Sequence, residues 1–254
     1  MVIRLTKGRL KVAIAENRAE LGEVAAREVA AYIMALQKEK PEVNIIFASA
    51  PSQNEFLANL LHYDIDWGRI NAFHMDEYIG IDPHAPQSFG QFLRDRIFSK
   101  RNFKSVNYIN PQAADPEAEC ARYAALLRQM PADMVFLGIG ENGHLAFNDP
   151  HVAFFDDPLT VKTVDLDPTC IRQQVNDGCF SSIDQVPTRA YTITIPELLY
   201  VKKLFAIVPT ITKPNANKRT CDGPIVSSCP ASILRTHRDC TLYVDRDSAS
   251  LVSR

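Results

Sequence analysis

The sequence predicts an α/β fold: a single-domain, open and mostly parallel sheet with helices on both faces, of the Rossmann-like, doubly wound type. Short apolar runs typical of buried strands alternate with longer segments whose apolar residues recur at helical spacing. The chain has 254 residues, 46% of them hydrophobic, which is enough for a large core. No repeat, low-complexity tract or linker divides it. We therefore expect one domain over residues 1–254.

In the first half of the chain, strand and helix signals alternate. Strands are expected at four short apolar runs, residues 10–15, 43–48, 70–75 and 134–137. Helices are expected at residues 18–38, 52–62, 87–98 and 116–129. Asn17 and Ser52 stand where the first two helices would begin, and both residue types favour the N-cap position.

The second half continues the pattern with shorter elements. Strands are expected at residues 159–164, 190–195, 204–208 and 241–244. A short helix would span residues 196–201, with Pro196 at an early position that proline tolerates, and a further helix would start near Thr212. This succession favours parallel strands joined by helical connections.

Composition excludes several classes of function. The net charge of −2 offers no attraction to nucleic acid or to an anionic membrane. The longest apolar stretches fall far short of a membrane span, and residues 1–7 do not resemble a signal peptide. The six cysteines form no Cys-x-x-Cys pair. We expect a cytoplasmic protein with reduced thiols that binds neither nucleic acid nor membrane.

Three polar segments directly follow predicted strands, at residues 49–52, 74–78 and 138–149. Ligands of open α/β sheets bind beyond the carboxyl ends of the strands. We therefore expect these three segments to meet at one edge of the sheet and to form a site there.

Adjacent carboxylates, Asp76 and Glu77, follow one of these strands. Burial of either would raise its pKa and let it take a proton near neutral pH. The alternative is that one carboxylate caps a turn and the other is solvated. For an isolated Asp-Glu pair, that alternative is the more frequent case.

The segment after the strand at 134–137 supplies His144, with Asn142 and Asp149 close in sequence. An imidazole oriented by a carboxylate is a common acid–base unit; the alternative is a histidine that is merely packed. The preceding Gly138-Ile139-Gly140 lacks the third glycine of a dinucleotide fingerprint. We expect no cofactor.

A metal site is a further alternative. His144, Asp149 and His151 are close in sequence, and two other histidines, His74 and His84, flank Asp76. Metallohydrolases use such groups. Because no recognised ligand spacing is present, we expect no metal.

Two motifs together resemble a known family. His-Met-Asp-Glu-Tyr-Ile-Gly at 74–80 and Gly-Ile-Gly-Glu-Asn-Gly-His-Leu-Ala-Phe-Asn-Asp-Pro at 138–150 are similar to the signatures of glucosamine-6-phosphate deaminases, also called isomerases. The resemblance continues through Gln-Val-Pro at 185–187 toward the C-terminus. The related 6-phosphogluconolactonases share the Gly-x-Gly-x-x-Gly-His portion. They usually continue with Ala-Ser-Leu-Phe-Pro, whereas this chain has Ala-Phe-Asn-Asp-Pro at 146–150.

The resemblance implies a reaction and its residues. Family members convert an aminosugar phosphate to a ketose phosphate and ammonia. Asp76 matches the base that moves a proton between C2 and C1, and His144 matches the histidine that opens the sugar ring. Asp149 stands where the family usually has Glu, and Asn142 where it usually has Asp.

These two departures have competing explanations. Asn142 cannot accept a proton but can orient an imidazole, and Asp149 is one methylene shorter than Glu. In the first explanation, the role of the carboxylate has moved to Asp149 or Glu141. In the second, the chain acts on another aminosugar phosphate, such as the galactosamine epimer. A weak or non-deaminating relative is the third interpretation.

The resemblance also implies a phosphate site. The family has a Thr-Gly-Gly-Thr-like turn where this chain has Ser-Ala-Pro-Ser at 49–52. Ser49 and Ser52 retain hydroxyl donors, although a helix cap is an equal alternative for them. Arg172 and Lys213 match the family's phosphate-binding arginine and lysine.

We therefore predict an enzyme of carbohydrate metabolism that deaminates and isomerises glucosamine-6-phosphate or galactosamine-6-phosphate. Its partner is a small phosphosugar, and a homo-oligomer is left open. A 6-phosphogluconolactonase-like hydrolase and a non-catalytic phosphosugar-binding protein are the alternatives.

Overall fold

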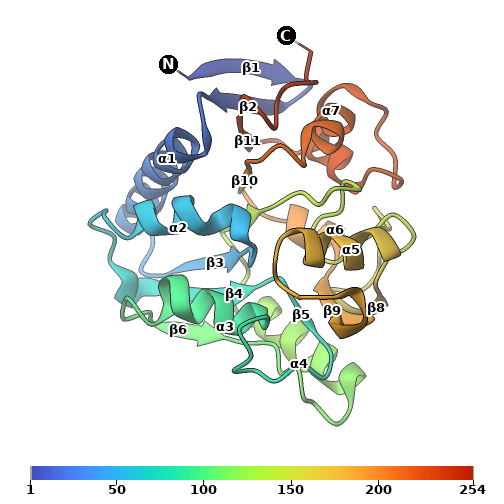
Figure 1. The fold of residues 1–254 in the computed structure, drawn as a ribbon. Helices are drawn as coiled ribbons and strands as arrows, with labels where there is room; N and C mark the ends of the chain where they lie inside the picture. The colour runs from blue at the N-terminus through green and yellow to red at the C-terminus, as the bar shows by residue number, and fades with distance from the viewer. Residues whose placement is uncertain (1, 254) are drawn as a thin grey trace.

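An eight-stranded sheet forms the centre of the molecule (Figure 1). The structure is a computed structural model that describes residues 2–253. The strand order is β1-β2-β11-β10-β7-β3-β4-β6. The strands, in chain order, are β1 (Ile3–Lys7), β2 (Leu10–Ala15), β3 (Val43–Phe47), β4 (Ile70–His74), β6 (Ser105–Asn107), β7 (Met134–Leu137), β10 (Lys203–Val208) and β11 (Cys240–Asp245).

All pairings in this sheet are parallel except that of β1 with β2. From β3 the chain proceeds to β4 and β6 in one direction, whereas β7, β10 and β11 follow on the other side of β3. The order of the strands therefore reverses between β3 and β7. Such a reversal is the place where open α/β sheets form their ligand sites.

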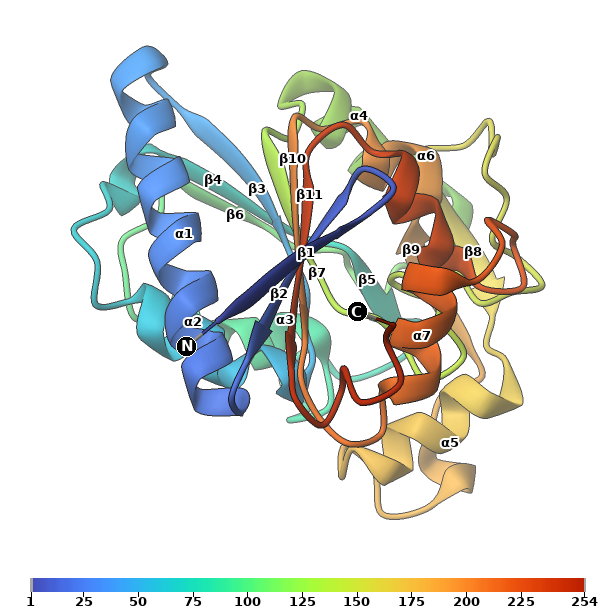
Figure 2. The ribbon, with the colours of Figure 1, turned by 90° about the horizontal axis from the view of Figure 1, so that it is seen from above.

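Helices cover both faces of the sheet, which confirms the predicted fold class (Figure 2). One face packs against α1 (Arg18–Glu39), α2 (Asn54–Leu60) and α3 (Phe89–Leu93). The other packs against α4 (Pro116–Gln129), α6 (Ile195–Leu199) and α7 (Pro214–Asp222). None of the helices in residues 2–253 is long and apolar enough to cross a membrane.

A smaller antiparallel sheet, of order β5-β9-β8, packs on the second face. Its strands are β5 (Asp76–Tyr78), β9 (Arg189–Ile193) and β8 (Val161–Asp165). The prediction of a polar loop at 74–78 is thus wrong in part, because Asp76 begins a strand that pairs with Thr192. This pairing fixes the backbone on both sides of the predicted base.

Local sequence signals predicted some helix ends correctly and others wrongly. The Asn17 side chain accepts the Glu20 N–H at 3.0 Å and caps α1 as predicted. Ser52 caps nothing, because the short helix Pro51–Gln53 precedes α2 without a side-chain cap. The helix expected at 87–98 changes after α3 into the π-helix Arg94–Phe98. Strand β1 and helix α5 (Pro168–Asn176) were not anticipated.

Close packing of α1 on α2 depends on Gly22. A Cβ at this position would lie 2.6 Å from Glu55 Cβ and 2.9 Å from its carbonyl carbon. The backbone of α2 therefore approaches α1 more closely than any side chain would permit, and only Gln53 separates α2 from the turn at 49–52.

We predict that Gly22→Ala lowers the free energy of unfolding by about 1–3 kcal/mol, since the extra methyl group overpacks the contact. Helix propensity alone would raise it by about 1 kcal/mol. Urea denaturation measures the balance. A variant at least as stable as the parent chain would contradict this account of the helix contact.

Candidate active site

A cavity of about 390 Å³ lies at the carboxyl ends of four neighbouring strands, β10, β7, β3 and β4. Each strand contributes the residues that follow it. Lys213 comes after β10, His144 after β7, the Ser49–Ser52 turn after β3, and Asp76 after β4. The three predicted polar segments thus meet at the switch between β3 and β7.

Two acceptor groups orient the imidazole of His144 through its Nδ1 atom. Its Nδ1 lies 2.8 Å from Asn142 Oδ1 and 3.1 Å from Asp149 Oδ1. The Asn142 amide nitrogen donates to the same Asp149 oxygen at 2.9 Å, so its carbonyl oxygen faces the ring. Because both neighbours of Nδ1 accept, Nδ1 carries the proton and Nε2 is left as a base. A Cβ at Gly140 would overlap the ring, so glycine is needed there.

Asp149 is fully buried, and its second oxygen accepts the Asp167 N–H at 3.0 Å. Burial alone would raise the pKa of this carboxyl. The hydrogen bonds from His144, Asn142 and Asp167 outweigh burial and lower the pKa below its usual value. Asp149 therefore remains ionised and can stabilise an imidazolium.

Asp76 lines the same cavity and is 6% exposed. Within residues 2–253 no hydrogen bond or ion pair satisfies its carboxylate. Burial, and secondarily the charge of Glu77, raises the pKa of Asp76 well above its usual value. A carboxylate that is buried but unpaired is a strong base toward a group brought into the cavity.

Glu77 has a structural role: of the adjacent carboxylates Asp76 and Glu77, it is the one that binds backbone N–H groups. Its carboxylate accepts backbone N–H groups of Tyr78, Phe89 and Gly90, and the Ser88 hydroxyl at 2.8 Å. It thereby fixes the start of α3 against β5. Burial raises the pKa of Glu77, and these hydrogen bonds oppose that rise.

Hydroxyl and ammonium groups gather in another part of the cavity lining. Ser49 is buried, and its Oγ has no hydrogen-bond partner in the part of the chain described. Ser52 Oγ accepts from Gln53 Nε2 at 3.0 Å. Lys213 is 5% exposed, and burial lowers the pKa of its ammonium group. No hydrogen bond or ion pair within residues 2–253 engages that ammonium. These groups suit an anion.

The turn that presents Lys213 is strained. Thr210 has φ of 93°, a conformation that is rare for a β-branched residue. Its N–H donates to Asp245 Oδ2 at 3.1 Å, and its carbonyl accepts the Lys213 N–H. Both Thr210 and Lys213 line the cavity, so the strain is stored where the chain contacts a ligand site.

The structure does not bring Arg172 into the cavity. This residue lies on the exposed side of α5, whereas the two residues that follow it, Gln173 and Gln174, line the cavity together with the C-cap residue Asp177. The assignment of Arg172 to the phosphate by motif stays a prediction, which the exposed position of this residue does not support. A helix α5 had not been predicted, so the exposed and buried sides of this segment could not be distinguished.

Two other arginines line the cavity, Arg18 and Arg96. Sequence reasoning missed both. Arg18 follows the Asn17 cap at the end of β2, and the rule that sites form at strand ends could have found it. No sequence signal distinguishes Arg96 from its neighbours, because it belongs to the π-helix, which the sequence did not predict.

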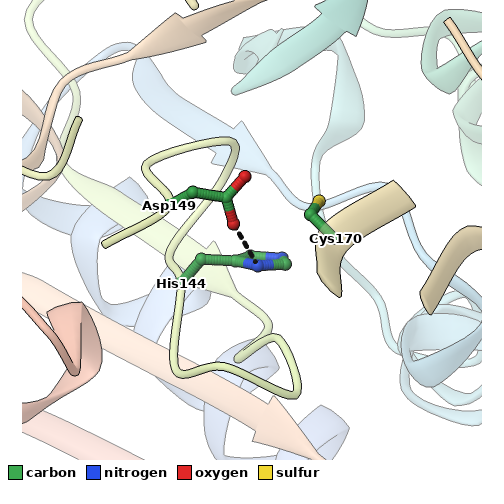
Figure 3. Close-up of side chains that lie close together, drawn as sticks. All are labelled: His144, Asp149 and Cys170. Carbon is green, nitrogen blue, oxygen red and sulfur yellow. Dashed lines mark ion pairs between the residues drawn. The ribbon is translucent and has the colours of Figure 1, made fainter. Parts of the chain in front are cut away.

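One group of metal-ligand type occurs among the described residues. Ligand atoms of His144, Asp149 and Cys170 lie within 4.8 Å of one another (Figure 3). Both carboxylate oxygens of Asp149 already accept N–H groups, and Nδ1 of the imidazole faces acceptors. Burial raises the pKa of the Cys170 thiol well above its usual value. Within this group, Asp149 therefore serves as a hydrogen-bonded support for the imidazole.

Comparison with known proteins agrees with the motifs. The family model described as glucosamine-6-phosphate isomerases/6-phosphogluconolactonase matches residues 16–243. A glucosamine-6-phosphate deaminase of Listeria innocua is 38% identical over 212 residues, which cover 83% of this chain and 88% of that protein. One from Lactobacillus delbrueckii subsp. bulgaricus is 30% identical over 243 residues, covering 96% and 100%.

Solved structures show the same fold. A monomeric glucosamine-6-phosphate deaminase matches with a TM-score of 0.85 and 31% identity, covering 94% of this chain and 99% of that one. The 6-phosphogluconolactonase of Leishmania guyanensis matches with a TM-score of 0.78 at 20% identity, covering 96% and 98%. The second similarity is one of fold.

The contact between Asn142 and Asp149 yields a first test of the site. Asn142→Asp places a carboxylate oxygen where an N–H now donates at 2.9 Å. One carboxyl of the pair must then hold a proton, so we expect a loss of about 1–3 kcal/mol at pH 8 that shrinks toward pH 5. Thermal unfolding at both pH values measures this. Asn102→Asp, at an exposed position, is the matched control. Equal melting temperatures for both variants at pH 8 would refute the expected loss of stability in Asn142→Asp.

The burial of Asp76 yields a second test. A raised pKa in the folded state means that stability falls as pH rises through that pKa, because the ionised form is poorly solvated. Asp76→Asn stays neutral and is spared this loss. We expect its melting temperature to exceed that of the parent by at least about 2 °C at pH 8, with the gain shrinking as the pH is lowered. No gain at pH 8 would show that the carboxylate is well solvated.

Proposed function

The chain belongs to the family of glucosamine-6-phosphate isomerases and 6-phosphogluconolactonases, and on this premise we propose that it is an aminosugar-phosphate deaminase. It converts glucosamine-6-phosphate, or its galactosamine epimer, to a ketose phosphate and ammonia. The observation that carries the proposal is one cavity lined by two different proton-transfer groups. One is the unpaired carboxylate of Asp76, and the other is the oriented imidazole of His144.

His144 opens the sugar ring. With Nδ1 hydrogen-bonded to Asn142 and Asp149, Nε2 takes the proton of the anomeric hydroxyl and passes a proton to the ring oxygen. The imidazolium formed in between is stabilised by the ionised Asp149. In the open-chain form, the aldehyde at C1 makes the C2 hydrogen acidic enough for a base to remove.

Asp76 performs the isomerisation. Its carboxylate removes the C2 proton and returns a proton to C1, while one proton of the substrate's ammonium group passes to the C1 oxygen. A hydroxymethyl group is then left at C1, and the carbon that bears nitrogen, C2, becomes an iminium carbon. Water adds to that carbon, and ammonia leaves, so atoms and charges balance. A buried base with a raised pKa suits this transfer, because a weakly acidic C–H needs a strong base. Each of these steps is a proton transfer or a hydration, so none calls for a metal or cofactor.

Asn142 orients rather than titrates in this proposal. It accepts from the His144 ring and donates to Asp149, so the single carboxylate of the network is Asp149. This geometry supports the explanation in which the carboxylate's role has moved to Asp149. It therefore favours a working deaminase over an inactive relative.

The lactonase alternative has less support, because the lactonase structure described above shares the fold at 20% identity. We also propose a cytoplasmic location. The free state of the cysteines within residues 2–253 supports it.

Ammonia and ketose phosphate are to be measured with glucosamine-6-phosphate and galactosamine-6-phosphate, beside a lactone hydrolysis assay. We expect one aminosugar phosphate to be deaminated and Asp76→Asn to reduce kcat by about 10²–10⁴-fold, since it removes the base. Asp64→Asn, at an exposed position, is the control. Lactone hydrolysis without ammonia release would replace the deaminase assignment, and full activity in Asp76→Asn would remove Asp76 as the base.

A further inference from the structure

Arg96 is a cavity residue to which neither the motifs nor the proposed mechanism gives a role. It lies in the π-helix Arg94–Phe98, which continues α3, and it lines the cavity. π-helical segments frequently accompany functional sites because they redirect side chains.

The guanidinium group is held firmly at one end. Its Nε donates to Asn54 Oδ1 at 2.9 Å, and its Cζ lies over the Phe92 ring, 4.3 Å from the centroid. Within residues 2–253, no hydrogen bond or ion pair engages either Nη. The group is therefore oriented in advance, and both terminal amino groups remain available as a fork of donors.

The other arginine of the cavity is already occupied. Arg18 pairs through Nε with Glu55 at 2.7 Å, and its Nη2 donates to the Pro51 carbonyl. Its positive charge is thus balanced by a neighbour. Among the described arginines that line the cavity, Arg96 is the one without a carboxylate partner.

The contacts of Arg96 place it near the Ser49–Ser52 turn on one side and near Cys179 on another. Asn54 comes two residues after Ser52, so the hydrogen bond to Asn54 ties the guanidinium to the Ser49–Ser52 turn. On another side it lies near Cys179: burial, and then Asp177, raise the pKa of that thiol to about 11, and the Arg96 charge opposes the rise. Arg96 thus faces the cavity between the turn and the segment after α5.

We propose that Arg96 binds the phosphate group of the substrate through both Nη groups, acting with Ser49 and Lys213. It takes the role that the motif had assigned to Arg172. This inference rests on the proposed function for the identity of the sugar, but the recognition of a phosphate group is independent of the reaction. Arg96 then determines specificity for phosphorylated over unphosphorylated aminosugars, because a bidentate charged contact is lost when the phosphate is absent.

The competing interpretation is a purely structural clasp, in which Arg96 joins the π-helix to α2 through Asn54. Arg96→Met distinguishes the two, because methionine keeps an apolar chain over Phe92 and removes the charged fork. Arg96→Lys retains a charge without bidentate geometry. Arg172→Met makes the same change at the exposed arginine of α5.

Two measurements are made on the purified full chain: steady-state kinetics with the aminosugar phosphate, and binding of inorganic phosphate by titration calorimetry. We expect Arg96→Met to raise KM and the phosphate Kd by roughly tenfold to a hundredfold, with kcat nearly unchanged. Arg96→Lys should fall between Arg96→Met and the parent. Arg172→Met should change neither constant.

Unchanged KM and Kd in Arg96→Met, or a larger loss in Arg172→Met, would overturn the inference. So would a lowered melting temperature with unaltered phosphate binding, which is the sign of a structural clasp. If the parent chain turns over no aminosugar phosphate, the proposed function fails, while the phosphate titration still decides the role of Arg96.

Discussion

The parallel pairing of β10, β7, β3 and β4 is the constraint on which the rest of the structure depends. Because these four neighbours run the same way, the residues after each strand emerge at one edge. That edge receives the Lys213 turn, the His144 loop, the Ser49–Ser52 turn and Asp76. Since the strand order reverses between β3 and β7, the loops diverge there and leave a cavity of about 390 Å³ between them.

Within this frame, two carboxylates are given opposite properties. Asp149 is buried but receives N–H donors on both oxygens, so its pKa falls and it remains a fixed negative charge beneath His144. Asp76 is buried without donors, so its pKa rises and it can exchange a proton. The difference lies in hydrogen bonding rather than in depth. Because their environments separate the two pKa values, one cavity holds both a fixed negative charge and a carboxyl that can exchange a proton.

The fold and most of the site were predictable where the signal was local. Asn17 capped its helix, and apolar runs marked the parallel strands. Pairing between distant segments was not predictable: Asp76 begins β5 because it meets Thr192 on β9, and no pattern near Asp76 indicates that partner. The positions of Arg172 and Arg96 relative to the cavity were not predictable for a related reason. Which side of α5 or of a π-helix faces a cavity depends on tertiary packing.

In the proposed mechanism, a carboxylate shielded from water carries one proton from C2 to C1. The direct measurement uses aminosugar phosphate deuterated at C2, with the ketose phosphate isolated at low conversion and analysed by NMR for deuterium at C1. Since Asp76 is 6% exposed, exchange with solvent competes poorly, and we predict that part of the deuterium is retained at C1. Product that carries only solvent hydrogen at C1 would contradict transfer by a buried base.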